Sequence, residues 1–178
     1  MVPALIGPVP AVAVTGVSGS GKSTLAAQLA GHLGWAFIEG DDHHPAANIA
    51  KMSAGIPLTD ADRWPWLQAL ADLVAANARA GVPTVLACSA LRRCYRDRLR
   101  AGTGLVFLHA DGPAEIVRER IASRRDHFMP ARLLDSQLAI LERLGSDEPG
   151  VSVSIAGPPE EVLAALAALE GLGVLRSD

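Results

Sequence analysis

Residues 16–23, with the sequence GVSGSGKS, match a pattern that binds nucleotide phosphates. Glycines allow consecutive backbone N–H groups to converge on phosphate oxygens, and a helix that starts within the pattern adds the positive end of its dipole. Lys22 can reach the β- and γ-phosphates, and the Ser23 hydroxyl can bind Mg²⁺. The pattern predicts a nucleoside triphosphate site with the ligands Gly16, Ser18, Gly19, Ser20, Gly21, Lys22, Ser23 and Thr24.

The alternative for these residues is an ordinary Gly/Ser turn, and the flanking sequence argues against it. An apolar run precedes the pattern and leucines recur at helical spacing after it. This predicts a strand over about 11–15 and a helix from Lys22 to about Leu33. Gly34 is typical of the residue that follows a helix. The order of strand, loop and helix is the context in which the pattern binds phosphate.

An acidic, histidine-rich segment at 39–45 follows a second short apolar run at 35–38. In open α/β sheets ligands bind beyond the carboxyl ends of strands, so this segment should face the phosphate loop. Asp41 can then accept the proton of a hydroxyl that attacks the γ-phosphate, which is the role of a kinase's catalytic carboxylate.

Two other interpretations of this segment stay open. Residues 41–44 offer carboxylate and imidazole groups to a transition metal, although adjacent side chains on an extended segment rarely converge on one ion. The segment can also be a solvated acidic loop, which is the usual fate of a charge cluster.

Three further apolar runs predict strands at 84–88, 105–108 and 151–155. Helix-length segments separate the strands, as parallel βαβ units require. The predicted helices cover 48–52, a long stretch that Pro65 opens after a polar connection at 55–63, and a last stretch from Pro159. The residues expected to be buried are Trp66, Leu67, Leu70, Leu73 and Val74 in the long helix, and Val162, Leu163, Leu166 and Leu169 in the last one.

Composition limits the class of protein. The 178 residues suit one domain, and 49% hydrophobic with 20% charged residues is typical of a globular chain. The net charge of −3 gives no reason to expect a nucleic acid partner, and no apolar run approaches the roughly 20 residues of a membrane-spanning helix. Cys88 and Cys94 fit neither a disulfide framework nor a metal-ligand spacing. We therefore expect a cytoplasmic protein without nucleic acid or membrane partners.

Many residues between 14 and 142 form a second, longer pattern. They are Gly40-Asp41, His44-Pro45, Asn48-Ile49, Lys51-Met52, Gly55, Pro57-Leu58, Asp60, Asp62-Arg63, Pro65-Trp66-Leu67, Cys88-Ser89-Ala90-Leu91, Tyr95-Arg96-Asp97, Leu99-Arg100, His127-Phe128-Met129, Leu133-Leu134, Ser136-Gln137 and Leu141-Glu142. In order and spacing this pattern resembles the bacterial gluconate kinase (gluconokinase) family.

The resemblance implies a fold shared with nucleoside monophosphate kinases and shikimate kinase. This is an α/β fold, a P-loop three-layer αβα arrangement with a five-stranded parallel sheet and a mobile helical lid. The implied organisation is a single kinase domain over 1–178, with an acceptor-binding segment at 39–66 and a lid region at about 118–142. A homodimer is also implied.

The same resemblance implies a function. The family uses ATP to phosphorylate D-gluconate at the 6-hydroxyl, giving 6-phospho-D-gluconate and ADP, a step that feeds sugar-acid catabolism. The implied catalytic residues are Asp41, Lys22 and Arg124, and the ATP phosphates would also meet Arg120 and Arg124. The implied substrate-binding residues are Asp41, His44, Asn48, Lys51, Arg63, Ser89 and Arg92. Mg²⁺ would bind Ser23 and, directly or through water, Asp41.

The physical chemistry of the reaction agrees with these roles. A carboxylate substrate needs cations in its pocket, and Lys51, Arg63 and Arg92 are available. Arginines on a closing lid can stabilise the charge of the transferring phosphoryl group and exclude water. Arg118 and Arg125 are expected to face solvent. A solvated basic helix is the alternative for the lid arginines, and a surface helix cation is the alternative for Arg92.

The sequence departs from the family pattern at several positions. Glu39 stands where the family commonly has Asp, Asp42-His43 replace more apolar residues, and Arg92 stands where Lys is frequent. A guanidinium is not equivalent to an ammonium, so the role of Arg92 stays open. The adenine contact is expected near residues 156–158, where no side chain identifies the base.

Two other functions remain. One is a kinase for another small hydroxy acid such as shikimate. The other is a regulatory GTPase, because residues 147–150 spell D-x-x-G. However, no apolar strand precedes them, and the chain has no Asn-Lys-x-Asp guanine signature. The strand expected at 84–88 leads into Ser89 with no acidic residue at its end, which disfavours a motor ATPase.

Overall fold

The computed structural model describes residues 10–123, 131–155 and 160–175. Five parallel strands form one sheet in the order β2-β3-β1-β4-β5. Their bounds are β1 Ala11–Thr15, β2 Ala36–Glu39, β3 Thr84–Ala87, β4 Leu105–Asp111 and β5 Gly150–Ser154. The predicted five-stranded parallel α/β fold is therefore confirmed. Within the described ranges, no helix is both long enough and apolar enough to cross a membrane.

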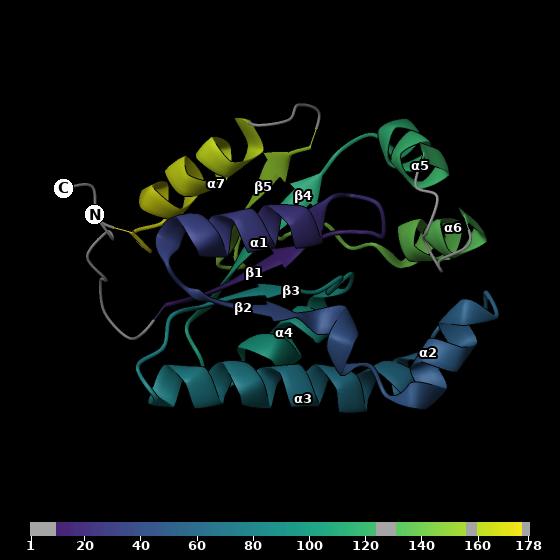
Figure 1. Ribbon diagram of the computed structural model, residues 1–178, viewed down its shortest axis with the longest axis horizontal. Coiled ribbons are helices and arrows are strands. Elements are labelled where there is room, and N and C mark those ends of the chain that lie inside the picture. Colours follow the sequence, from purple (N-terminus) through teal and green to yellow (C-terminus); the bar gives the residue numbers. More distant parts are fainter. Residues whose placement is uncertain (1–9, 124–130, 156–159, 176–178) are drawn as a thin grey trace.

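Helices cover both faces of this sheet (Figure 1). One face carries α1 (Lys22–Leu33) and α7 (Glu160–Gly171), and the other carries α3 (Asp60–Arg79) and α4 (Arg93–Arg100). The remaining helices, α2 (Ala46–Ser53), α5 (Ala114–Ser123) and α6 (Ala131–Ile140), gather at the end to which the strands point. The carboxyl ends of the strands are therefore enclosed by helices on several sides.

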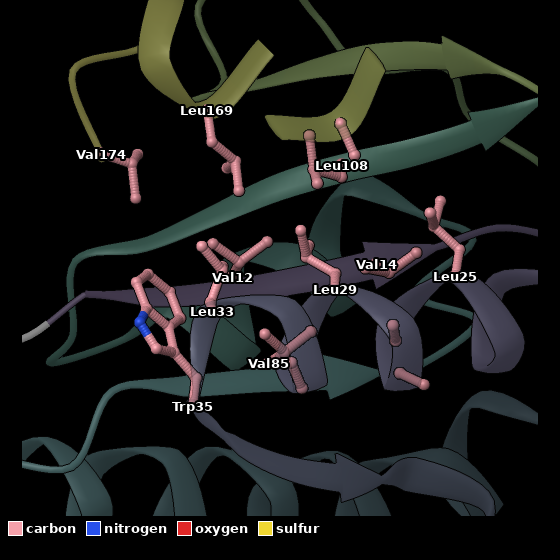
Figure 2. Close-up of a cluster of buried hydrophobic side chains, with 14 of the residues drawn as sticks. Val12, Val14, Leu25, Leu29, Leu33, Trp35, Val85, Leu108, Leu169 and Val174 are labelled. Atoms are coloured by element: carbon pink, nitrogen blue, oxygen red, sulfur yellow. The ribbon is translucent and has the colours of Figure 1, made fainter. Parts of the chain in front are cut away.

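The central strand β1 is buried on both faces, which explains its continuous apolar sequence. Val12 and Val14 pack toward α1 and α7, together with Leu29 and Leu108 (Figure 2). The alternate residues of β1 pack in the second cluster, which is formed with α3 and α4. A third cluster, under α5 and α6, includes Val17 of the phosphate loop. The loop that follows β1 is thus fixed by the core at its base.

The long helix starts earlier in the structure than the sequence predicted. Helix α3 begins at Asp60, five residues before Pro65, so residues 60–63 are helical and the predicted polar connection is shorter. The Thr59 side chain accepts from the Asp62 N–H, and the Asp62 carboxylate accepts from the Thr59 N–H at 2.8 Å. This reciprocal cap is the reason for the earlier start. Hydrogen bonds from Lys51 and then from Thr59 lower the pKa of Asp62 to about 2.

Other boundaries differ by smaller amounts. Strand β4 continues to Asp111, because its polar residue His109 still pairs with Thr15 of β1. Strands β2 and β5 are each displaced by one residue from the prediction, and α2 extends the predicted short helix on both sides. In α3, Leu73 is 36% exposed rather than buried.

The last helix buries a different set of side chains from the predicted one. Leu169 is buried as expected, and Leu166 is partly buried, but Leu163 is 65% exposed and Ala165 takes a core position. The predicted Val162 contact lies outside the described side chains.

The two cysteines have different environments. Cys88 directly follows β3 and is fully buried, and its N–H donates to the carbonyl oxygen of Val14. Burial raises the pKa of the Cys88 thiol to about 12. Cys94 lies on α4 and is exposed. Cys88 therefore acts as a small core residue.

Candidate active site

The phosphate-binding loop, residues 16–23, joins the end of β1 to the start of α1. Gly21 caps the helix with a left-handed backbone (φ 86°), and Gly19 is also left-handed (φ 80°). The side chain of Ser20 is buried, and its Oγ has no hydrogen-bond partner among the described residues. Such a buried polar atom needs a partner, and a phosphate oxygen can supply it. Lys22 is 8% exposed, whereas Thr24 is exposed on the first turn of α1.

Helix α5 lies directly against this loop. A Cβ at Gly19 would lie 2.5 Å from Cγ1 of Ile121, so only glycine permits this approach. Arg120 donates to the carbonyl oxygens of Ser20 (3.2 Å) and Ile155 (2.5 Å). A predicted phosphate ligand, Arg120, therefore lies beside the loop.

The other arginines of the predicted lid divide into two groups. Arg118 is exposed and forms an ion pair with Asp135 of α6 at 2.8 Å, in agreement with its predicted solvent-facing position. Arg124 and Arg125 lie outside the described residues, as does the turn expected to meet adenine at 156–158.

A cavity opens where the phosphate-binding loop meets the segment that follows β2. We call it the strand-end cavity, and its lining residues are Lys22, Asp41, His44, Met52, Pro57, Leu58, Arg63, Trp66, Ser89, Leu91, Leu133, Ser136 and Gln137. Lys22 and Asp41 come from loops after different strands, which confirms that residues 39–45 face the phosphate loop.

The segment after β2 is a 3₁₀ turn, η1 (Gly40–His43), rather than a loose acidic loop. A Cβ at Gly40 would lie 2.4 Å from the carbonyl oxygen of Ala87, so glycine is needed for the turn to pass this close to β3. The Trp66 indole N–H donates to the Gly40 carbonyl oxygen at 2.7 Å. Asp41 is thus presented by a backbone that is fixed on two sides.

Asp41 has a histidine behind it. His44 Nε2 lies 3.8 Å from Asp41 Oδ1, and the imidazole stacks on Trp66 with 4.0 Å between ring centroids. The Asn48 amide donates to the Asp62 carbonyl oxygen at 2.9 Å, and its Nδ2 lies 3.3 Å from His44 Nδ1. Because an amide NH₂ can only donate, Nδ1 is the acceptor and Nε2 carries the ring proton.

The protonation state of His44 follows from its environment. Burial lowers the pKa of His44 to about 4; the nearby Asp41 opposes this shift and Arg63 adds to it. His44 is therefore neutral near pH 7 and turns an N–H toward the Asp41 carboxylate.

Arg63 supplies a cation to the cavity wall. Its guanidinium donates to the Leu58 carbonyl oxygen at 2.6 Å and lies 5.5 Å from the ring centroid of Tyr95. The Tyr95 hydroxyl donates to Asp60 Oδ1 at 2.5 Å. These contacts leave Arg63 oriented and beside the cavity, where it can meet an anionic group.

Three predicted substrate residues do not line the strand-end cavity. Asn48 is buried behind His44. Lys51 forms an ion pair with Asp62 at 2.7 Å. Arg92 is paired with Asp60 at 3.0 Å and Glu142 at 3.4 Å. Each of them holds another part of the wall instead, because its polar atoms are taken by protein groups.

A buried ion pair fixes the loop that carries Ser89. Arg96 and Glu148 are each 1% exposed in their side chains and meet at 2.6 Å. Arg96 also donates to the carbonyl oxygens of Ala90 (3.1 Å) and Glu142 (3.0 Å). The hydrogen bond from Arg96 is the main cause that lowers the pKa of Glu148. Ala90 has a left-handed backbone (φ 41°), which this network must hold in place.

Reasoning from the sequence gave no role to Arg96 or to the α6 residues of the cavity wall, Leu133, Ser136 and Gln137. All four belong to the pattern shared with the family, and that pattern was the signal that could have found them. For the metal hypothesis at residues 41–44, the described part of the chain contains no group of three or more His, Cys, Asp or Glu side chains that could hold an ion.

Known proteins resemble this chain in sequence and structure. A family model described as an AAA domain matches residues 12–144. The gluconokinase of Gluconobacter oxydans (strain 621H) is 51% identical over 84% of this chain and 85% of its own length. The thermoresistant gluconokinase of Escherichia coli (strain K12) is 44% identical over 84% of this chain and 86% of its own length.

Solved structures of kinases also resemble this chain. A crystal structure of a gluconokinase from Sinorhizobium meliloti 1021 matches with a TM-score of 0.84 and 45% identity, covering 94% of this chain and 95% of that one. Shikimate kinase from Aquifex aeolicus matches with a TM-score of 0.62 and 20% identity, covering 92% of this chain and 98% of that one, a likeness of fold alone.

Proposed function

Because this chain belongs to the gluconokinase family, we propose that the strand-end cavity holds D-gluconate beside the phosphate-binding loop. The protein is a P-loop kinase that uses ATP to phosphorylate gluconate. The proposed acceptor is the 6-hydroxyl, and the products are 6-phospho-D-gluconate and ADP. The observation that carries this proposal is that Lys22 and Asp41 line one cavity.

The proposed roles of the cavity residues follow from their chemistry. Asp41 orients the attacking hydroxyl and accepts its proton as the new P–O bond forms. Arg63 binds the gluconate carboxylate, and Ser89 binds a hydroxyl. His44 lines the same wall, and its Nε2 lies 3.8 Å from Asp41 Oδ1. Asn48, Lys51 and Arg92 position these groups from behind, through the pairs described above.

The proposed nucleotide site uses the backbone N–H groups of the phosphate-binding loop. Negative charge on the transferring phosphoryl group is met by Lys22, Arg120 and, from outside the described residues, Arg124. The remaining proposed ligands are Gly16, Ser18, Gly19, Ser20, Gly21, Ser23 and Thr24.

Mg²⁺ is proposed to accompany ATP. In kinases this ion usually binds one or two protein oxygens together with phosphates and water. Ser23, the second residue of α1, is half-exposed, and the Asp41 side chain is 47% exposed, so both residues fit such a shell. When bound, Mg²⁺ neutralises charge on the β- and γ-phosphates.

We infer the wider organisation from the family resemblance. Residues 1–178 would act as one kinase domain with an acceptor-binding segment at 39–66. Residues 118–142, which include most of α5 and all of α6, would form a lid that closes over ATP. We further infer a cytoplasmic homodimer with no nucleic acid or membrane partner.

The first prediction tests Asp41. Asp41→Asn keeps the side-chain shape but removes the charge, so we expect kcat to fall about a hundredfold or more, while ATP affinity stays nearly unchanged. A coupled ADP-release assay with gluconate, shikimate or no acceptor measures this, and only gluconate should support turnover. Asp42→Asn is the matched control, because Asp42 is exposed on the same turn and does not line the cavity.

Magnesium titration separates the two proposed roles of Asp41. If high Mg²⁺ restores the activity of Asp41→Asn, the residue anchors the metal and is not the base. Near-normal turnover at every Mg²⁺ concentration would contradict both roles.

A further inference from the structure

Gln137 on α6 joins the phosphate-binding loop to the strand-end cavity. Its Oε1 accepts a hydrogen bond from the backbone N–H of Ser18 at 2.7 Å, a contact between residues 119 positions apart. The same side chain lines the cavity together with Lys22, Asp41 and Ser89. Gln137 therefore belongs to the cavity wall and also contacts the phosphate-binding loop.

The hydrogen bond to Ser18 fixes the orientation of the carboxamide. A backbone N–H can only donate, so the oxygen of Gln137 must face the loop and Nε2 must point elsewhere. In the part of the chain that the structure describes, no group accepts a hydrogen bond from Nε2. The two N–H groups of Nε2 are the polar groups that Gln137 has available for the cavity.

The neighbouring polar side chains on α6 are already occupied. The Ser136 hydroxyl donates to the carbonyl oxygen of Leu133 at 2.7 Å, within the helix. Asp135 is exposed and forms the ion pair with Arg118. Among the described α6 residues that line the cavity, Gln137 is thus the one whose side chain has free donors.

The other polar groups of the cavity indicate what such donors would meet. Lys22 and Arg63 are cations suited to phosphate and carboxylate groups, and Asp41 is an acceptor suited to a hydroxyl proton. A neutral double donor is suited to the lone pairs of a hydroxyl oxygen. A polyhydroxy acid presents several such oxygens beside the hydroxyl that reacts.

We propose that Gln137 Nε2 binds a hydroxyl oxygen of the acceptor and so positions gluconate relative to the phosphate-binding loop. This inference rests on the proposed function, because it takes the strand-end cavity as the gluconate site. Since Oε1 is held by the backbone of the loop, the acceptor and the transferring phosphoryl group share one reference point. Small errors in that alignment lower the rate strongly.

Two substitutions test the donor role. Gln137→Glu keeps an oxygen for the Ser18 N–H but replaces the NH₂ group with a second oxygen and adds negative charge. Gln137→Met keeps the length and removes both groups. For gluconate we expect kcat/KM to fall about tenfold in Gln137→Met and about a hundredfold in Gln137→Glu, where a like charge also faces an anionic substrate. The affinity for an ATP analogue without gluconate should change less than about threefold in Gln137→Met.

Gln28→Met is the matched control, because Gln28 is exposed on α1 and does not line the cavity, so its kinetics should equal those of the wild type. Thermal denaturation of each full-length variant checks the fold.

Four results would overturn the inference. Wild-type kinetics in Gln137→Glu, with a lower Tm in Gln137→Met, would make Gln137 only a tether between α6 and the loop. Tighter binding of the ATP analogue to Gln137→Met, with an unchanged KM for gluconate, would mean that the amide merely occupies a phosphate position.

If Asp41→Asn and Arg63→Gln also leave the gluconate kinetics unchanged, the cavity is not the acceptor site and the proposed function fails with the inference. If only the Gln137 variants are unaffected, the inference fails alone.

Discussion

At the scale of single residues, His44 shows how burial sets the charge beside Asp41, the proposed catalytic carboxylate. A protonated His44 would pair with Asp41 and draw the carboxylate away from the proposed acceptor hydroxyl. The stack on Trp66 and the amide of Asn48 surround the ring, and burial lowers its pKa to about 4. The neutral ring therefore lies beside Asp41 without adding a positive charge there.

This lowered pKa predicts a pH dependence of stability. His44 binds a proton more readily in the unfolded chain, near pH 6.5, than in the folded one, near pH 4. The free energy of unfolding should therefore fall as the pH falls from about 7 to 5. Burial also lowers the pKa of His109, so His109 adds to this fall of the free energy of unfolding at lower pH. Carboxylates with lowered pKa values, such as Asp62, lose their contribution only below this range.

Urea unfolding at several pH values between 7 and 5 measures the effect. We expect the free energy of unfolding to change less steeply with pH in His44→Gln than in the wild type. His43→Gln, at an exposed neighbouring position, should keep the wild-type dependence on pH. Equal slopes in the wild type and His44→Gln would contradict the assignment.

At the scale of elements, the contact between the phosphate-binding loop and α5 determines what the loop tolerates. Gly19→Ala would place a methyl group 2.5 Å from Ile121 Cγ1 in a left-handed backbone (φ 80°). The backbone alone costs about 1–2 kcal/mol, and the overlap would push α5 and Arg120 away from the loop. We expect a lower Tm and a loss of about tenfold or more in kcat/KM for ATP.

Two variants isolate the cause of this loss. Gly31→Ala is the matched control, because Gly31 lies on α1 with no atom near an added Cβ, and alanine there should stabilise the helix by about 0.5–1 kcal/mol. Ile121→Ala should restore part of the activity of Gly19→Ala by making room. No rescue in the double variant would mean that backbone strain, rather than α5, is responsible.

At the scale of the whole molecule, the Arg96–Glu148 pair connects segments that are distant in sequence. It ties α4, the loop after β3 and the segment between α6 and β5 to one another. Breaking such a buried pair on one side leaves the other charge without compensation. We expect Glu148→Gln to lower the free energy of unfolding by about 3 kcal/mol.

The control for this prediction is an exposed pair on the same helix. Arg93 and Asp147 meet at 2.6 Å, but their side chains are 47% and 64% exposed, so Asp147→Asn should lower the free energy of unfolding much less than Glu148→Gln does. Chemical denaturation compares the two variants. Similar small losses in both would mean that water reaches the buried pair.

Sequence patterns predicted those parts of the fold that local spacing determines. The strand, phosphate loop and helix at 11–33 follow from apolar runs and a helical period. The predicted start of α3 was wrong because Pro65 was taken as its first residue, although Thr59 and Asp62 have the spacing of a capping pair in the sequence. The polar end of β4 was missed because His109 interrupts the apolar run.

The candidate site could be predicted only in part. The meeting of Asp41 and Lys22 followed from a general rule about strand ends. The contacts of Gln137 with Ser18 and of Arg96 with Glu148 join residues 119 and 52 positions apart, and no local pattern indicates such pairs. The pairing of Lys51 and Arg92 with nearby carboxylates likewise depends on how the helices pack.

The two cysteines lie in unlike environments, so their relative reactivity reports local opening of the central sheet. Cys94 is exposed on α4, whereas Cys88 sits in the core with its pKa raised to about 12, so it offers almost no thiolate to a reagent. Alkylation of Cys94 therefore proceeds in the folded chain, while alkylation of Cys88 must wait until β3 separates from β1. The ratio of the two labelling rates therefore measures how often the central sheet opens locally. Mass spectrometry can follow both rates without any introduced probe.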